Sequence, residues 1–318
     1  MEIGAFMDRV LVGAVDIGGT KIAVAIVDNQ GRILIQRETP TEPEAGFDAA
    51  IKRIDLRLRE CLKESGASLQ GIGIGCTGPV NPCTGEIGIV GLLPGWDGRN
   101  LVQALSERFA VRTALENDAD AASLGEAFWG AGRGKNTLIC VTIGTGIGGG
   151  IIVGRKLYRG VGNSHPEVGH HVIDAFGPLC YCGANGCWEV LARGPAMAEW
   201  AIQNAPKDYP HLKGLTARHL CELATGAEPF ALKAVKREAF YLGLGISNLV
   251  TLYSPDMIVL GGSVMRSSHL FLPEIRRMVR QNCGLVPHEK TEIILASLGP
   301  DAPLIGAARV WHHRFNGE

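Results

Sequence analysis

Residues 10–27 read VLVGAVDIGGTKIAVAIV, and this stretch decides the fold class. The apolar run at 10–15 has the length of a β-strand, and a second apolar run begins at Ile22, directly after the turn DIGGTK at 16–21. A dinucleotide-binding fingerprint needs a helix after its glycines, and a P-loop needs GxxxxGK[ST] at the start of a helix. Neither motif is present, so the order strand, glycine turn, strand predicts a phosphate-binding turn within a β-hairpin.

The same arrangement occurs a second time, in residues 137–153. The apolar run LICVTI at 138–143 leads into the turn GTGIGGG at 144–150, and a further apolar run follows. Glycines allow backbone amides to approach an anion closely, and the hydroxyl of Thr20 or Thr145 adds a donor. A single glycine-rich hairpin is usually only a hairpin. Two copies predict two related halves around a cleft, with turns that grip a polyphosphate from both sides.

A third glycine pair, Gly261 and Gly262, ends an apolar run that starts at Met257. A strand that ends in two glycines can let a flat ring lie against the backbone, and it can equally form a tight turn, which is the commoner case. The pair is thus a candidate contact for a flat ring, and an ordinary turn remains the alternative.

A possible metal site has the pattern H-x9-C-x-C-x4-C and consists of His170, Cys180, Cys182 and Cys187. Three thiolates and one imidazole complete a tetrahedral ligand set for a structural zinc ion. Unrelated buried thiols and a disulfide are the alternatives. Three cysteines this close together, with glycines between them, favour zinc. His171 is a rival to His170 that spacing does not exclude. The metal would hold the carboxylates of Glu167 and Glu189 in place.

Composition limits the classes of function. The chain has 318 residues with a net charge of −1 and 46% hydrophobic residues, so it can build a large core and has no electrostatic footprint for nucleic acid. Its nine cysteines are an odd number and fit a reducing cytosol better than a disulfide scaffold. The first residues are charged and do not look like a signal peptide, and the uncharged stretch 136–154 is too rich in glycine for a membrane span. We expect a cytoplasmic protein without a nucleic-acid or membrane partner.

A candidate catalytic base lies in residues 115–129, which read LENDADAASLGEAFW. Asn117, Asp118 and Asp120 could each cap the helix that follows, which is the usual role of such residues. In the functional interpretation, Asp118 is a general base and Asn117 a hydrogen-bonding neighbour. Phosphoryl transfer to a hydroxyl needs a carboxylate on the acceptor proton and little other covalent chemistry. The position of Asp118 between the two glycine turns supports the second interpretation.

Together these motifs resemble those of the ROK family of repressors, open reading frames and sugar kinases, over nearly the whole chain. DIGGTK at 16–21 resembles the first phosphate motif of the family, and IGTGIGGG at 143–150 followed by EVGHH at 167–171 resembles its signature region. CYCGANGCWE at 180–189 resembles its zinc motif, and the Gly-His pairing favours His170 as the fourth ligand. The resemblance implies an α/β fold of the hexokinase/actin-like (ribonuclease H-like) type, with duplicated domains and a cleft between them.

The resemblance also implies the roles of individual residues. Asp118 would be the catalytic base that takes the proton of the sugar 6-hydroxyl. The predicted sugar-binding residues are Gly78, Asn117, Glu167, His170 and Glu189. The predicted nucleotide-binding residues are Asp16, Gly18, Gly19, Thr20, Lys21, Thr145, Gly146, Gly261 and Gly262. The implied cofactors are ATP, Mg²⁺ and a structural Zn²⁺, and the implied assembly is a homodimer.

The predicted function is ATP-dependent phosphorylation of a hexose, with glucose as the first candidate and N-acetylmannosamine or N-acetylglucosamine as alternatives. A sugar-sensing regulator without turnover is the alternative from another class. The repressors of the family carry an added N-terminal helix-turn-helix domain, for which we expect no room before the motif at 16–21. Leu92 stands where many relatives have a sugar-contacting asparagine, so the exact sugar stays open. We expect a small domain of residues 1–118 plus 303–318, completed by a C-terminal helix, and a large domain of residues 119–302 with the zinc site.

Overall fold

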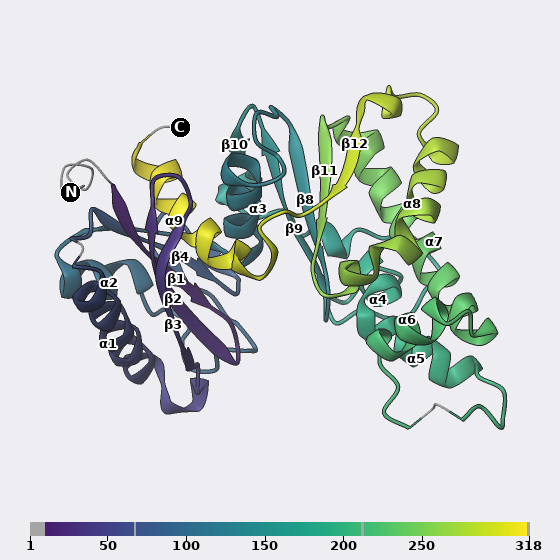
Figure 1. Cartoon of the computed structure of the whole chain (residues 1–318), viewed down its shortest axis with the longest axis horizontal. Coiled ribbons are helices and arrows are strands. Elements are labelled where there is room, and N and C mark those ends of the chain that lie inside the picture. Colours follow the sequence, from purple (N-terminus) through teal and green to yellow (C-terminus); the bar gives the residue numbers. More distant parts are fainter. Residues whose placement is uncertain (1–9, 67, 211–212, 317–318) are drawn as a thin grey trace, which may run out of the picture. The chain divides into compact units, whose positions relative to one another are not determined.

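The computed structural model describes residues 10–66, 68–210 and 213–316, which form two compact units (Figure 1). Unit 1 comprises the described residues up to Gly134, the segment Gly150–Pro166 and the described residues from Ser297 onward. Unit 2 comprises Lys135–Gly149 and the described residues of Glu167–Ala296. The predicted domain boundary at residue 118 stays a prediction, but the contact-defined unit 1 continues past it. The reason is that helix α3 (Asp118–Trp129) packs on the C-terminal helix α9 (Ala302–Phe315) of the same unit.

Unit 1 is built on a five-stranded sheet in the order β3-β2-β1-β4-β7. Strand β1 pairs in antiparallel with β2, which pairs in antiparallel with β3, whereas β1, β4 and β7 are parallel. The strands are β1 (Leu11–Ile17), β2 (Lys21–Asp28), β3 (Ile33–Pro40), β4 (Gly71–Cys76) and β7 (Arg112–Asn117). A small hairpin of β5 (Val80–Asn81) and β6 (Glu86–Ile87) follows β4. The glycine turn of residues 18–20 thus joins two antiparallel strands, as the sequence pattern predicts.

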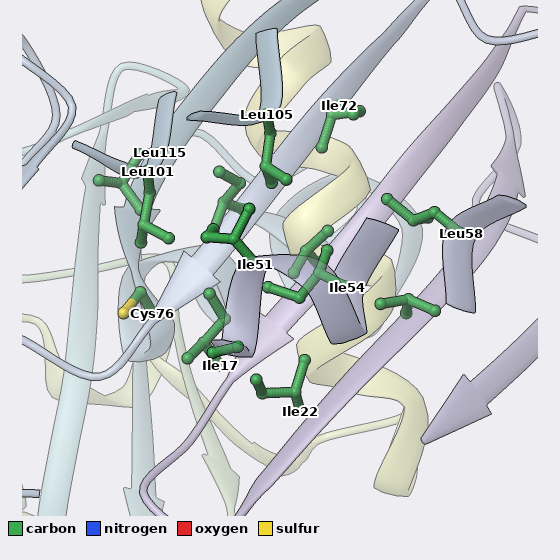
Figure 2. Close-up of a cluster of buried hydrophobic side chains, with 14 of the residues drawn as sticks. Ile17, Ile22, Ile51, Ile54, Leu58, Ile72, Cys76, Leu101, Leu105 and Leu115 are labelled. Carbon is green, nitrogen blue, oxygen red and sulfur yellow. The ribbon is translucent and has the colours of Figure 1, made fainter. Parts of the chain in front are cut away.

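Apolar side chains cover both faces of this sheet, because successive residues of a strand point to opposite sides. On β2, Ile22 and Val24 belong to one core, whereas Ala23 and Ala25 belong to the other. The first core is closed by α1 (Phe47–Ser65) and α2 (Leu101–Phe109). Figure 2 shows this core, in which Ile51, Ile54 and Leu58 of α1 point toward Ile17, Ile22 and Ile72 of the sheet.

The second face of the sheet is covered by α9, with α1 and α9 on opposite sides (Figure 1). Small residues permit the close approach. A β-carbon on Gly73 of β4 would lie 1.8 Å from the carbonyl oxygen of Ala307, and one on Gly71 would lie 1.8 Å from Nε1 of Trp311. The C-terminal helix thus packs on the sheet formed by the N-terminal part of the chain.

Unit 2 is built on a second five-stranded sheet in the order β10-β9-β8-β11-β12, in which β8, β11 and β12 are parallel and β9 and β10 antiparallel. The strands are β8 (Leu138–Ile143), β9 (Ile147–Val153), β10 (Lys156–Leu157), β11 (Met257–Gly261) and β12 (Glu292–Leu295). Its helices are α4 (Trp188–Ala192), α5 (Gly194–Asn204), α6 (Ala217–Thr225), α7 (Pro229–Tyr253) and α8 (Ser268–Asn282). Helices α7 and α8 pack side by side (Figure 1).

The chain also forms single turns of 3₁₀-helix, which mostly connect the larger elements. They are η1 (Pro43–Ala45), η2 (Val161–Asn163), η3 (Val168–His170), η4 (Val264–Ser267), η5 (His288–Lys290) and η6 (Gly299–Asp301). Across the described ranges, no helix combines the length and the hydrophobicity that a bilayer crossing would require.

The two sheets have the same strand order when each is numbered from its own first strand, namely 3-2-1-4-5. In both, the glycine turn follows the first strand and leads into the second. The prediction of an α/β protein with two related halves is therefore confirmed.

Unit 2 buries an ionisable group that should make stability depend on pH. Glu238 of α7 is fully buried, neither carboxyl oxygen has a hydrogen-bond partner, and the guanidinium of Arg237 lies 3.7 Å away. Burial raises the pKa of Glu238 well above its usual value, and Arg237 offsets only part of this. As pH rises past the ordinary glutamate pKa, the unfolded chain loses this proton while the folded chain retains it, so stability falls until the folded pKa is reached.

We predict that Glu238→Gln raises the free energy of unfolding relative to wild type at pH 8 but not at pH 4, by about 1.4 kcal/mol for each unit of elevated pKa. Urea unfolding across this range measures the difference. Glu274→Gln is the matched control, because Arg277 lowers the pKa of Glu274 and its removal should act with the opposite sign. Parallel pH curves for wild type and Glu238→Gln would contradict the prediction.

Candidate functional site

The carboxyl ends of three parallel strands lie at the same edge of the first sheet. The register pairs Ile17 of β1 with Cys76 of β4, and Cys76 with Asn117 of β7. This pairing brings Asp16, at the end of β1, close to Asp118, the first residue of α3. In open α/β sheets, ligands bind outside the carboxyl ends of the strands.

The two aspartates influence each other electrostatically. Burial, together with the charge of Asp118, raises the pKa of Asp16 to about 7, and Lys21 opposes the shift. Burial also raises the pKa of Asp118, although the backbone N–H of Ala119 donates to its Oδ1 at 2.8 Å and stabilises the charged form. A carboxylate with a raised pKa is a better proton acceptor than a solvated one, which suits a general base.

Asn117 caps α3, since its side-chain oxygen accepts a hydrogen bond from the N–H of Ala119 at 2.9 Å. The predicted sugar-binding residue Gly78 lies against Asn117, because a β-carbon on Gly78 would be 2.6 Å from Nδ2 of Asn117. Both residues therefore belong to the same edge of the sheet as Asp118. Of the possible caps, Asn117 caps the helix, whereas Asp120 pairs with Arg159 and His165.

The first glycine turn is held by the backbone. The N–H of Gly18 donates to the carbonyl of Lys21 at 3.0 Å, and the hydroxyl of Thr41 donates to the carbonyl of Gly18 at 2.7 Å. Nζ of Lys21 forms an ion pair with Glu38 at 2.7 Å, and both side chains are exposed. Leu92 lies against the turn, since a β-carbon on Gly19 would be 2.9 Å from that of Leu92.

The second glycine turn connects β8 and β9 in unit 2 and contacts Glu189 of α4. The N–H of Ile147 donates to Oε2 of Glu189 at 2.8 Å, and a β-carbon on Gly146 would lie 2.5 Å from the same oxygen. Gly262 follows β11 with a φ of +91°, and its β-carbon would lie 2.3 Å from the carbonyl oxygen of Ile143. Only glycine fits there, so Gly262 lies directly beside the end of β8.

A cavity of about 670 Å³ opens beside the second turn, within unit 2. Gly144 and Thr145 form one wall, and Ser263, next to Gly262, lies on the wall from β11 and η4. Helices α5 and α6, with Leu215 just before α6, supply the mainly apolar remainder, which includes Pro195, Ala198, Ile202 and Cys221. Pockets of this size and lining accept cofactors. The glycine pattern in the sequence predicts the wall formed by Gly144 and Thr145. No sequence motif predicts the walls formed by the helices.

The four predicted zinc ligands come together in unit 2. Their ligand atoms all lie within 4.8 Å of one another. Sγ of Cys180 is 3.5 Å from Nδ1 of His170, and Sγ of Cys182 is 3.5 Å from Sγ of Cys187. Ligands of a tetrahedral zinc ion, with Zn–S bonds of about 2.3 Å, lie about 3.7 Å apart, so the donor set fits zinc in type and spacing.

His171 does not belong to this cluster. Its Nδ1 lies 2.6 Å from the carbonyl oxygen of Val168, and its ring packs on Trp188. Trp188 is fully buried and donates from Nε1 to the carbonyl of Tyr241 in α7 at 3.0 Å. The chain after the last cysteine is therefore anchored to the core of unit 2. The loop before that cysteine is held by the hydrogen bonds of its own turns.

Tyr181, which lies within the cysteine pattern, was not among the predicted site residues. Its hydroxyl lies 2.8 Å from Nε2 of His170, although the side chain is 80% exposed. Partial desolvation and the charges of Glu189 and Glu167 raise the pKa of Tyr181 to about 12. Nε2 of His170, a predicted sugar-binding residue, is thus engaged with Tyr181. The structure brings together His170, Glu189 and Glu167 around this tyrosine.

A second group that the sequence did not reveal surrounds Asp120, whose side chain is fully buried. Oδ2 of Asp120 is 2.6 Å from Nη1 of Arg159 and 2.7 Å from Nδ1 of His165. Arg159 also pairs with Glu116, whose pKa burial raises to about 7. This network ties the segment 150–166 to α3 immediately after Asp118, and the charge of His165 lowers the pKa of Asp118. The partners lie more than 30 residues apart in the sequence, so no local pattern links them.

Comparison with known proteins agrees with this geometry. Residues 12–314 match the ROK family. The chain belongs to the ROK family.

Two curated ROK relatives differ in what their names say they do. A glucokinase from Streptomyces coelicolor is 34% identical over 310 residues, covering 92% of this chain and 95% of the relative. A xylose repressor from Bacillus spizizenii is 30% identical over 304 residues, covering 95% of this chain and 77% of the repressor.

A solved ROK structure is similar over almost the whole chain. It is a ROK family glucokinase from Streptomyces griseus in complex with glucose and AMPPNP, with 33% identity, a TM-score of 0.78, and coverage of 94% of this chain and 98% of that one. The chain therefore has the hexokinase/actin-like α/β fold of the ROK sugar kinases, as its sequence predicts.

We predict that Gly146→Ala in this ROK protein weakens both nucleotide and sugar binding, by about tenfold, because the new methyl group displaces Glu189 and its hydrogen bond to Ile147. Gly284→Ala is the matched control, since its β-carbon would have no neighbour within 4 Å and Gly284 is not a predicted site residue. Calorimetric titration with AMPPNP and with glucose measures both. Equal affinities in wild type and Gly146→Ala would show that the contact between Gly146 and Glu189 does not affect ligand binding.

We also predict one tightly bound zinc ion per chain, lost in Cys182→Ala and retained in Cys83→Ala, whose cysteine is exposed and lies outside the cluster. Without the ion the loop from 171 to 187 should become mobile, so Cys182→Ala should lose sugar affinity more than nucleotide affinity. Elemental analysis and calorimetry measure both effects. Freshly purified wild-type protein without zinc would contradict the assignment.

Proposed function

We propose that this ROK protein catalyses ATP-dependent phosphorylation of a hexose at the 6-hydroxyl, with glucose as its preferred substrate. The observation that carries the proposal is Asp118, a partly buried carboxylate with a raised pKa at the edge of the sheet where Asp16 and the first glycine turn also lie. Phosphoryl transfer needs a base on the acceptor hydroxyl and preorganised contacts for the phosphates, and little other covalent chemistry.

Different residues of unit 1 would accept the proton, contact the sugar and bind the phosphates and Mg²⁺. Asp118 would accept the proton of the hydroxyl, and Asn117 and Gly78 would contact the sugar. Backbone amides of the turn at residues 18–20 would face phosphate oxygens, as glycine-rich turns do. Asp16 would hold Mg²⁺ directly or through water, and the ion would neutralise charge on the transferred phosphoryl group. Lys21 lowers the pKa of Asp16 and so favours its ionised, metal-binding form.

The predicted nucleotide- and sugar-binding residues of unit 2 would make contacts of their own. The cavity beside Thr145 has the size and apolar lining suited to a nucleoside, and the turn at Gly146 lies at its edge. Glu167 and Glu189 would hydrogen-bond sugar hydroxyls, and His170 would do so once a sugar hydroxyl replaces that of Tyr181 on its Nε2. Because Glu189 also accepts from the N–H of Ile147, one carboxylate would contact both the sugar and the turn. Zinc on the His170 cluster would hold this group of residues in position.

The preference for glucose over an N-acylhexosamine rests on the named glucokinase relatives, one of which was solved with glucose. Leu92 is the departure that bears on this choice, since it is 61% exposed and lies against Gly19. A leucine offers no hydrogen bond where many relatives have an asparagine, which would lower affinity for a polar group at this position. N-Acetylmannosamine and N-acetylglucosamine are therefore the substrates to compare.

A sugar-binding regulator without turnover is the second candidate, because the chain is also similar to a xylose repressor. The presence of Asp118 and of both glycine turns favours the kinase. An ADP-release assay with glucose, N-acetylmannosamine, N-acetylglucosamine and xylose distinguishes the candidates. Sugar binding without ADP release would support the regulator, and a higher kcat/KM for an N-acyl sugar would overturn the choice of glucose.

We predict that Asp118→Asn keeps its fold and sugar affinity but loses kcat by about 10²–10⁴-fold, because the amide cannot accept the hydroxyl proton. Asn117→Ala is an informative partner variant. It removes the cap of α3 and should lower stability by about 1 kcal/mol, with a smaller loss of kcat. Steady-state kinetics and thermal unfolding separate the two effects. Wild-type kcat in Asp118→Asn would leave Asp118 with a purely structural role.

A further inference from the structure

Tyr181 contacts a predicted sugar-binding residue of unit 2, although its own place in the sequence is between two predicted zinc ligands, Cys180 and Cys182. Its hydroxyl lies 2.8 Å from Nε2 of His170, and the two rings meet edge-on with their centroids 5.0 Å apart. The proposed function requires this hydroxyl to leave Nε2 when a sugar binds. The contacts of the phenol indicate what it does there before a sugar arrives.

The two ring nitrogens of His170 face different partners. Sγ of Cys180 lies 3.5 Å from Nδ1, so this nitrogen faces the predicted zinc ligands, whereas Nε2 faces Tyr181. A histidine that binds a metal through one nitrogen donates a hydrogen bond from the other. With Nδ1 as a zinc ligand, the proton of the ring is on Nε2, and the oxygen of the phenol accepts its hydrogen bond.

The hydroxyl of Tyr181 also interacts with Glu189. Partial desolvation, the charge of Glu189 and a hydrogen bond to the same carboxylate together raise the pKa of Tyr181 to about 12. Glu189 is buried, and its Oε2 already accepts from the N–H of Ile147 at 2.8 Å. Because a carboxylate can only accept hydrogen bonds, the phenol is the donor to Glu189.

The phenol therefore accepts one hydrogen bond, from His170, and donates another, to Glu189. A sugar hydroxyl between these two side chains would do the same, because every alcohol combines one donor with acceptor lone pairs. Exchange of the phenol for a sugar hydroxyl thus leaves both His170 and Glu189 with a partner. A polar group that lost its partner in this exchange would reduce the affinity for the sugar.

Little packing opposes the departure of the tyrosine. Its side chain is 80% exposed, so the ring buries little surface that would be lost when it turns into solvent. Exposed side chains change rotamer within nanoseconds, so this movement requires no rearrangement of the zinc ligands on either side. The two hydrogen bonds of the hydroxyl are therefore the main interactions that a sugar must replace.

We propose that the hydroxyl of Tyr181 takes the place of one sugar hydroxyl between His170 and Glu189 while no sugar is bound, and that the sugar binds by displacing it. The inference rests on the proposed sugar-binding role of these residues. Tyr181 is then a residue that sets the affinity for the sugar, because only the fraction of molecules in which the phenol has left the site can bind.

Calorimetric titration of the full, zinc-loaded chain with glucose tests the proposal. We expect Tyr181→Phe to bind glucose about threefold to tenfold more tightly than wild type, because the variant has no phenol hydroxyl to displace. The matched control is Tyr158→Phe, which removes the hydroxyl of an exposed tyrosine in unit 1 and should bind as wild type does. Equal or weaker binding in Tyr181→Phe would overturn the proposal.

Tyr181→Ala separates displacement from stacking of the ring on the sugar. It also lacks the hydroxyl, so it should bind glucose more tightly than wild type, as Tyr181→Phe does. A loss of affinity in Tyr181→Ala at unchanged zinc content would show that the ring supports the sugar, and the proposal fails. Elemental analysis of each variant measures the zinc content.

Crystal structures of the wild-type chain with and without glucose give a measurement that needs no variant. A glucose hydroxyl within hydrogen-bond distance of Nε2 of His170, in place of the phenol oxygen, supports the proposal. A phenol that keeps its contact with Nε2 in the glucose complex overturns it.

These experiments require no turnover, so they are independent of the ADP-release assay. Tighter glucose binding in Tyr181→Phe without ADP release supports displacement of the tyrosine and contradicts the proposed kinase activity. ADP release with equal glucose affinity in wild type and Tyr181→Phe supports the kinase and overturns the displacement.

Discussion

The parallel register of β1, β4 and β7 is the constraint on which the arrangement of unit 1 depends. It aligns Ile17, Cys76 and Asn117 across the sheet, and the residues next to these positions form the acidic edge. The register is held by burial on both faces of the sheet. Since the side-chain period of a strand is two, a slip of one residue would exchange the face toward α1 with the face toward α9.

Glycine makes this packing possible at particular places. Gly71 and Gly73 let α9 lie directly on β4, and α9 in turn packs against α3, which begins with Asp118. The last helix of the chain therefore supports the element that carries the proposed base. Gly262 has the equivalent role in unit 2, where it allows the end of β11 to lie beside the end of β8.

The site residues differ in how well their sequence context predicts them. The predicted zinc ligands lie within 18 residues, and the fixed donor types and tetrahedral geometry of a zinc site restrict such a set strongly, so spacing was informative. The choice between His170 and His171 was not available from spacing, because it depends on ring orientation: the ring of His171 is held against Trp188. For Asp120, in contrast, the sequence context did not predict the role of the side chain. It reads as one of several helix caps, yet it is buried with Arg159 and His165, partners that only the folded chain brings near.

The sequence by itself determined the local features: two strand–glycine-turn–strand motifs, the cysteine and histidine cluster, the Asn-Asp pair before a helix, and the family. The motifs in this list involve residues close together in the chain, where backbone geometry limits the possible structures, and together they identify the family. Only the tertiary structure decided the contact of Glu189 with the turn at Gly146 and the charge network of Asp120. These arise where distant segments pack, and the side chains that meet there are chosen by register and burial, which no short stretch of sequence encodes.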